Sequence, residues 1–256
     1  MKQTSLAAEQ FGATAHRYLT SAVHAHGADL ERLTALARQR HRPSVLDLGC
    51  GAGHAAFAMA RGGARVTAYD LSPDMLRVVE EEAGRRGIAG LHTRQGPAEH
   101  LPFADASFDV VATRFSAHHW ADVGRALDEV RRVLRAGGSL VVIDVVAPET
   151  PLLDTVLQTV ELLRDASHVR DYRASEWTVM LREAGFGIPQ CETWKLRMEF
   201  ETWVTRMRTP DVRVHAIRDV LAHAVDEVKR YFSVGNDGSF DIDIAWMETG
   251  APTSYS

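Results

Sequence analysis

The sequence has 256 residues, of which 45% are hydrophobic, so it is long enough to bury the core of one large domain. Its 29 Lys and Arg residues are scattered and are outnumbered by 34 acidic residues, which gives a formal net charge of -5. This balance argues against a nucleic-acid partner or an anionic membrane surface and favours a small-molecule partner. The two cysteines, Cys50 and Cys191, lack the spacing of a disulfide framework or a zinc site.

Targeting signals are not evident in the sequence. No apolar run approaches the ~20 residues that span a bilayer, and the first residues lack the apolar stretch of a secretion signal. We therefore expect a cytoplasmic protein that has no membrane partner and works as a monomer or homodimer.

Short β-branched runs alternate with helical patterns over the first 150 residues. Such runs at residues 45–48, 65–69, 91–95, 110–113 and 140–146 predict strands. The alternation predicts an α/β fold with a doubly wound, mostly parallel sheet that carries helices on both faces. Ser72 and Pro73 supply an N-cap and a first-turn proline for one helix. An apolar stripe between Val123 and Leu134 predicts another, closed by the glycines at 137 and 138.

Residues beyond 150 predict a helical region with two more strands. Helices are expected from Pro151, from a cap at Ser175 to a terminator at Gly185, around 200–207, and continuously after Pro210 to about 228. Strands are expected at 186–197 and 240–247. We expect a single domain with lid helices at 1–40, a ligand-binding core at 41–150, a helical cap with one strand at 151–230 and a final strand region at 231–256. The helices outside the core either cover a site or simply shield the sheet. Both alternatives stay open, because an apolar stripe alone does not distinguish a pocket wall from core packing.

A glycine-rich turn follows the first strand, in the segment VLDLGCGAG at 45–53. Glycines such as Gly49 and Gly51 let a ligand approach bare backbone, and the helix start that follows offers N–H donors to a carboxylate. A nicotinamide dinucleotide fingerprint would need a third glycine where His54 stands. Asp47 instead suits a ligand with an amino group beside its carboxylate, such as the methionine end of S-adenosylmethionine.

A second acidic residue, Asp70, ends the second strand, at the distance from Gly49 at which carboxylates meet ribose hydroxyls in nucleotide-binding α/β sheets. After the third strand, the loop at 96–103 is suited to hold an adenine ring between backbone amides and Leu71. Each carboxylate taken alone could equally serve as a cap or turn residue. Their order along the chain favours a cofactor site.

These motifs, VLDLGCGAGHAAFAMA, AYDLSPDML, GPAEHLPF, ASFDVV and EVRRVLRAGGSLVV, resemble those of class I S-adenosylmethionine-dependent methyltransferases over nearly the whole chain. FGATAHRYLTSAVHAHGADL and RDASHVRDYRASEW are similar to the branch of ubiquinone and menaquinone C-methyltransferases and their bacterial relatives. The resemblance implies a Rossmann-like seven-stranded sheet with an antiparallel last strand and S-adenosylmethionine as cofactor. The cofactor roles carry over to Asp47, Gly49, Gly51, Asp70, Leu71, Ala98 and Glu99. Pro97 stands where members often have an acidic residue, so Glu99 or backbone carbonyls must contact the adenine amino group.

Substrate-side candidates follow the fourth strand, in the segment from Arg114 to Trp120. His119 is our first candidate for a base or orienting group and His118 the second, and Arg114 is expected beside the cofactor. Either imidazole could instead serve local structure. Tyr18 is a third candidate, since an aromatic ring near a sulfonium is attracted to it, although a tyrosine on an apolar face often only packs.

The sequence therefore predicts transfer of a methyl group from S-adenosylmethionine to a carbon, oxygen or nitrogen of a small, partly apolar metabolite. A nicotinamide-dependent oxidoreductase and a non-catalytic S-adenosylmethionine-binding module remain as alternatives. No metal is expected, because the histidine pairs lack ligand spacing. Arg170 and Arg206 could bind an anionic substrate group or form ordinary salt bridges.

Overall fold

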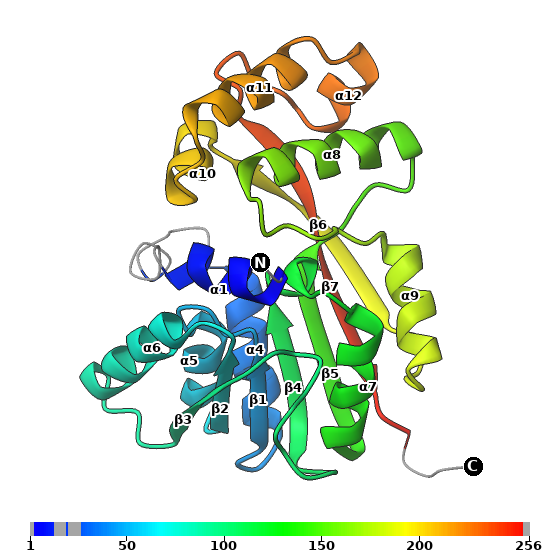
Figure 1. Ribbon diagram of the computed structural model, residues 1–256. Coiled ribbons are helices and arrows are strands. Elements are labelled where there is room, and N and C mark those ends of the chain that lie inside the picture. The colour runs from blue at the N-terminus through cyan, green and yellow to red at the C-terminus, as the bar shows by residue number, and fades with distance from the viewer. Residues whose placement is uncertain (1–2, 13–18, 20–26, 253–256) are drawn as a thin grey trace.

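The computed structural model describes residues 3–12, 19 and 27–252. A seven-stranded sheet with helices on both faces forms its centre (Figure 1). The strands are β1 (Ser44–Leu48), β2 (Arg65–Asp70), β3 (Leu91–Gln95), β4 (Phe108–Arg114), β5 (Leu134–Val145), β6 (Gln190–Met198) and β7 (Phe240–Gly250). The sheet order is β3-β2-β1-β4-β5-β7-β6, with β1 to β5 parallel and β7 antiparallel to both of its neighbours. This confirms the doubly wound, Rossmann-like sheet with an antiparallel last strand.

Alternating side chains of the central strands divide the core between the two faces of the sheet. Val45 and Val110 point to one face, where α4 (Ala28–Gln39), α5 (His54–Arg61) and α6 (Pro73–Arg85) pack. Leu46 and Val111 point to the other, covered by α7 (Val123–Val133) and α9 (Ala174–Glu183). Both sets are buried, as expected for parallel strands covered on two faces. Because helices cover both faces of the sheet, a ligand site can form at the edge where the carboxyl ends of the strands lie.

The remaining helices lie beyond that edge. Figure 1 shows α8 (Pro151–Arg164), α10 (Phe200–Arg206), α11 (Asp211–Ala222) and α12 (Asp226–Tyr231) grouped around one end of β6 and β7. Helix α1 (Gln3–Gly12) lies between this group and the sheet, where Gln3 donates to the carbonyl of Ser167 and Gln10 to that of Met207. In the described part of the chain, no helix has both the length and the apolar character of a membrane span.

Helix boundaries differ from the sequence prediction at three places. Helix α9 begins at Ala174 because the Glu176 carboxylate accepts the backbone N–H of Arg173, while Ser175 bonds to Glu149, so the cap expected at Ser175 is wrong. The helix after Pro210 is interrupted between Ala222 and Asp226.

Helix α7 is the third case, since it stops at Val133 rather than at the glycine pair. Leu134 already belongs to β5, pairing with Phe108, and an apolar stripe does not distinguish the last helical turn from the first strand residue. Two other signals are confirmed: Ser72 caps α6 through the N–H of Met75, and Gly185 ends α9 with a φ of 80°.

Candidate cofactor cleft and the histidine pair beside it

An open cleft with about 1040 Å³ of empty space lies at the carboxyl ends of β1, β2 and β4. Its walls come from the glycine-rich turn after β1, the end of β2, the loop after β3 and the segment after β4. Thr4 and Ala8 of α1 line it from the side opposite the sheet. In open α/β sheets this position, where neighbouring strands connect in opposite directions, is the usual ligand site.

The turn from Gly49 to Gly53 joins β1 to α5 with three positive φ angles, 70° at Gly49, 50° at Gly51 and 87° at Gly53. The N–H groups of Gly49 and Cys50 both donate to the carbonyl of Tyr69, which ties the turn to β2. A Cβ at Gly49 would overlap the Ser116 hydroxyl, whereas a Cβ at Gly51 would meet nothing within 4 Å. Gly49 thus permits close packing, and Gly51 leaves backbone open to the cleft.

Asp70 anchors this turn from the end of β2. Its Oδ2 accepts the N–H of Gly51 at 2.8 Å, and its Oδ1 accepts the N–H of Ser72 at 2.8 Å. Burial raises the pKa of Asp70 above its ordinary value, although these N–H donors oppose the shift. A carboxylate oxygen can accept more than one hydrogen bond, so the side chain can hold the turn and still accept ligand hydroxyls.

Asp47 is a buried carboxyl group without a hydrogen-bond partner for either oxygen in the described residues. It lines the cleft, and burial raises its pKa to about 7, with the charge of Asp70 adding to the shift. Leaving such a group unpaired costs free energy, so a native structure keeps it where a partner arrives. A ligand ammonium group would be such a partner.

The loop after β3 forms the other end of the cleft, where Leu71, Ala98 and Glu99 all line the space. The hydroxyl of Tyr69 donates to the carbonyls of Pro97 and His100 and so fixes the loop. The Glu99 carboxylate accepts the N–H groups of residues 121 and 122 at 3.0 and 3.2 Å, just before α7. Glu99 therefore has a structural role in holding this wall together.

Arg114 and the residue after it form the wall at the end of β4. Arg114 makes a buried ion pair with Asp29 of α4, with 2.5 Å between Nε and Oδ2. Phe115 has a φ of 52°, a left-handed conformation that costs a bulky residue free energy and often occurs at functional sites. Both side chains belong to the cleft lining.

His118 and His119 stand side by side in the short 3-10 helix η1 (Ala117–His119), with ring centroids 4.1 Å apart. His119 is one of the residues that line the cleft, and its Nδ1 donates to the carbonyl of Ser167 at 3.1 Å. His118 is not among the lining residues, and its Nδ1 contacts Oδ1 of Asp144 at 2.6 Å. Burial alone would lower the pKa of His118, but the charge and hydrogen bond of Asp144 outweigh it and raise the pKa to about 9. His118 is therefore charged at neutral pH.

Comparisons with known proteins agree with this geometry. The methyltransferase domain family matches residues 46–142. The chain is 49% identical over 200 residues to the uncharacterized protein YafE of Escherichia coli, covering 78% of this chain and 97% of that one. It is 36% identical over 224 residues to the uncharacterized methyltransferase YcgJ of Bacillus subtilis, covering 88% of each. The crystal structure of YcgJ matches with a TM-score of 0.85 at 34% identity and covers 90% of this chain and 100% of that one.

The chain is a class I S-adenosylmethionine-dependent methyltransferase. It is also 31% identical over 163 residues to the demethylmenaquinone methyltransferase of Chlorobaculum parvum, covering 56% of this chain and 66% of that one, as expected for the ubiquinone and menaquinone branch. This confirms the family, the fold and S-adenosylmethionine as the cofactor of the methyltransferase. The nicotinamide alternative is not supported.

The residues present in the cleft of the methyltransferase fit this cofactor. The unpartnered carboxyl of Asp47 matches an ammonium group, and open backbone at Gly51 matches a ligand pressed against the turn. All eight residues that the sequence proposed for the cofactor line one cleft: Asp47, Gly49, Gly51, Asp70, Leu71, Ala98, Glu99 and Arg114. Tyr18 lies outside the described residues. Within the described part of the chain, no group of three potential ligands is placed to hold a metal ion.

Three aspartates that contact candidate site residues of the methyltransferase were not predicted from the sequence. Asp29, Asp144 and Asp165 were not singled out, although each faces a candidate residue: Arg114, His118 and His119 respectively. No motif marks them, because their partners lie far away in sequence.

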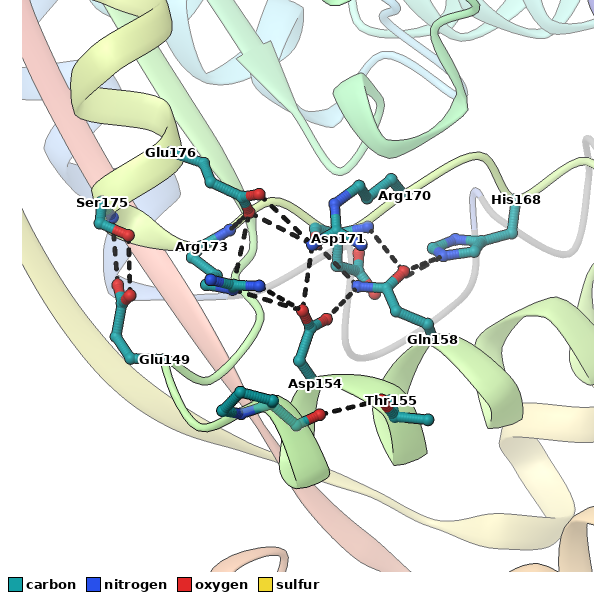
Figure 2. A network of polar contacts seen from close by, with 11 residues as sticks. Glu149, Asp154, Thr155, Gln158, His168, Arg170, Asp171, Arg173, Ser175 and Glu176 are labelled. Carbon is teal, nitrogen blue, oxygen red and sulfur yellow. Dashed lines mark hydrogen bonds and ion pairs between the residues drawn. The ribbon is translucent and has the colours of Figure 1, made fainter.

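The two arginines proposed for anion binding have different surroundings. Arg170 contacts Asp154 at 3.0 Å and Glu176 at 3.4 Å, in the network of Figure 2, which favours the salt-bridge alternative for it. Arg206 is buried in α10.

Proposed function

We propose that this methyltransferase transfers the methyl group of S-adenosylmethionine to a carbon, oxygen or nitrogen of a small, partly apolar metabolite, with His119 as the base or orienting group. The position of His119 carries the proposal, because this residue lines the cleft that also contains Asp47, Gly51 and Asp70. A base that lines the cofactor cleft is within reach of an acceptor aligned with the methyl group.

Each cofactor residue then has a separate task. Asp47 binds the ammonium group of the methionine end, and the backbone of Gly49 and Gly51, with Arg114, faces its carboxylate. Asp70 accepts the ribose hydroxyls. Leu71 and Ala98 pack against the two faces of the adenine ring. The Glu99 carboxylate accepts a hydrogen bond from the adenine amino group. Tyr18 would cover the sulfonium from the amino-terminal segment.

The acceptor class is suggested by charge and by relatives. Scattered basic residues and a net charge of -5 support a small acceptor rather than a nucleic acid. Relatives named for different acceptors, demethylmenaquinone and the malonyl group of an acyl carrier protein, indicate that the branch does not fix the acceptor. A hydroxyl-bearing ring is the first class to test. His118, which is paired with Asp144, acts on the site through His119 rather than on the acceptor directly.

Labelled cofactor tests the proposal. The purified enzyme is incubated with S-adenosylmethionine carrying an isotope-labelled methyl group and with the small-molecule fraction of a cell extract, and products are found by mass spectrometry. We expect a labelled small molecule that disappears with Asp70→Ala, decreases with His119→Gln and persists with His223→Gln, an exposed control. Absence of any labelled small molecule, together with label in the protein or nucleic-acid fraction of the same extract when that fraction is incubated in parallel, would refute the small-molecule acceptor.

A further inference from the structure

A buried group of histidines and carboxylates extends from His119, in the wall of the cleft, into the interior of the protein. It is formed by η1, the end of β5, the end of α8 and the loop that follows α8. We call it the histidine–carboxylate cluster. Its members are His118, His119, His168, Asp144, Glu161, Asp165 and Asp171.

The cluster contains more hydrogen-bond acceptors than donors. Figure 2 shows Gln158 between His168 and Asp171, where its amide nitrogen donates to the carboxylate Oδ1 of Asp154 and to the backbone carbonyl of Asp171. The Gln158 oxygen must therefore accept from Nε2 of His168, at 2.9 Å, which leaves Nδ1 of His168 as an acceptor. In the described residues the unpartnered atoms of the cluster are that Nδ1, both oxygens of Asp171 and Oδ2 of Asp165. Nδ1 of His168 and Oδ2 of Asp165 can accept a hydrogen bond, whereas burial raises the pKa of Asp171 well above its ordinary value and favours the protonated carboxyl there.

Asp165 is the member of the cluster that faces His119. Its Oδ1 accepts the backbone N–H of Ser167 at 2.8 Å and the Ser167 hydroxyl at 2.7 Å, which fixes the carboxylate. Its Oδ2, the unpartnered oxygen, is 3.9 Å from Nε2 of His119. Since Nδ1 of His119 donates to a carbonyl, Nε2 carries the lone pair when the ring is neutral. The unpartnered oxygen of Asp165 therefore lies beside the ring nitrogen of His119 that can take up a proton.

We propose that Asp165 is a positioning residue for methyl transfer, which stabilises the proton that His119 takes from the acceptor. This inference rests on the proposed function. The acceptor atom forms a bond to the methyl group as the bond from the methyl to the sulfonium sulfur breaks, and sulfur keeps the electron pair. The proton of the acceptor passes to Nε2 of His119. The positive charge thus leaves sulfur and appears on an imidazolium that lies beside the Asp165 carboxylate.

His118 and Asp144 set the starting state of this proton transfer. Asp144 also accepts the N–H groups of Ala117 and Val145, so it fixes η1 as well as the His118 ring. Burial first, and then the positive charge of His118, lower the pKa of His119 below its ordinary value. His119 is therefore neutral and able to accept a proton before the reaction. Glu161, His168 and Asp171 are the further ionisable members of the cluster, and Arg164 of α8 and Arg206 of α10 are the cations that face it.

This arrangement selects a chemical class of acceptor. An acceptor that loses a proton as it is methylated, such as a hydroxyl, a primary or secondary amine or an acidified C–H carbon, benefits from the His119–Asp165 pair. A tertiary amine or a thioether loses no proton and gains nothing from it. We therefore assign the first class to this enzyme.

The test does not require the acceptor to be known. Binding of S-adenosylmethionine and of S-adenosylhomocysteine is first verified by calorimetry, so that a failure of the proposed cofactor site is recognised separately. The pKa of His119 is then measured by NMR in each complex, using enzyme labelled in its histidine rings and His119→Gln for assignment. We expect the pKa to be roughly one unit higher with S-adenosylhomocysteine, because the sulfonium charge is gone.

Asp165→Asn supplies the decisive comparison. We expect it to lower the pKa of His119 by roughly one unit in both complexes, since the neighbouring negative charge is lost. Asp219→Asn, at an exposed position of α11, should leave it unchanged. Should Asp165→Asn fail to fold, Ser167→Ala keeps the carboxylate and the backbone N–H on its Oδ1 but removes the hydroxyl contact, and a smaller measurable change in the same pKa is expected. An unchanged His119 pKa in the folded variant, or an equal pKa in the two wild-type complexes, would overturn the inference.

Discussion

Within the part of the chain that the structure describes, two regions contain buried carboxyl oxygens without hydrogen-bond partners, and their surroundings differ. Asp47 lies in the wall of an open cleft, beside bare backbone at Gly51. Asp165 and Asp171 lie in a packed interior, surrounded by histidines. An unsatisfied group in a cleft is open to a ligand, whereas one in a packed interior is out of a ligand's reach and can instead stabilise a proton on a neighbouring side chain. The comparison separates the two proposals: the first region is suited to bind the cofactor, and the second is suited to stabilise a proton released in the reaction.

The largest expected effect is at the cofactor cleft. Asp70→Ala removes the acceptor of the Gly51 and Ser72 N–H groups and of the proposed ribose hydroxyls. Loss of two hydrogen bonds to a charged group should weaken S-adenosylhomocysteine binding by about 4 kcal/mol, roughly a thousandfold in Kd. Calorimetry measures this, with Asp74→Ala, an exposed acid of α6, as the control. Wild-type affinity in Asp70→Ala would remove Asp70 from the site.

The next effect concerns the cluster and its His118–Asp144 ion pair. Because the pKa of His118 is raised to about 9 in the folded state, the folded protein keeps a proton that the unfolded chain loses above its ordinary value of 6.5. The contribution of the pair to the free energy of unfolding is complete below pH 6.5 and declines by about 3 kcal/mol as pH rises to 9.

Urea denaturation at pH 6.5, 7.5 and 9 measures this decline. The His118→Gln variant should not show this decline. The difference in the free energy of unfolding between the variant and the wild type should therefore be largest at pH 6.5. His223→Gln, at an exposed position, should follow the wild type. Parallel pH profiles for His118→Gln and the wild type would contradict a charged His118.

A smaller effect sharpens the role of Asp47. Its pKa of about 7 means that at lower pH the carboxyl must lose a proton before it can bind an ammonium group. The affinity for S-adenosylhomocysteine should therefore fall as pH drops below 7, by up to about 1.4 kcal/mol, or tenfold, per pH unit. Calorimetry between pH 5.5 and 8 tests this. Asp47→Asn should bind more weakly at pH 8 and show a flat profile, and an equally steep profile in that variant would assign the titration to another group.

The smallest effect is expected at Glu99. Replacing it by Gln keeps an oxygen that can accept the N–H groups before α7 but removes the charge proposed to face adenine. We expect a loss of about 1 kcal/mol in cofactor binding, roughly fivefold in Kd, with little change in thermal stability. Glu183→Gln, at the exposed end of α9, is the control. A large fall in Tm without weaker binding would leave Glu99 a purely structural role.

The cofactor cleft was predictable because each of its walls is a short contiguous motif. The turn at 49–53, the acid at the end of β2 and the loop after β3 each carry a local signal, and parallel strands bring their ends to one edge. The sheet was predictable for a similar reason, since buried strands show as short β-branched runs.

The cluster was not predictable in the same way. Asp144 and Ala117 are 27 residues apart, and the ring of His119 meets Ser167 across 48 residues. A histidine pair in the sequence marks one side of such a contact but gives no information about the other. The cap of α9 shows the same limit on a smaller scale, since the hydroxyl of Ser175 is taken by Glu149 from another segment.

The most direct measurement for the central claim is a crystal structure of the enzyme with S-adenosylhomocysteine. We predict the ribose on Asp70, the amino group within hydrogen-bond distance of Asp47, and the sulfur on the side of the cleft that His119 lines. A ligand with its sulfur at the Glu99 end, or bound away from the glycine turn, would contradict both the cofactor site and the route of the proton.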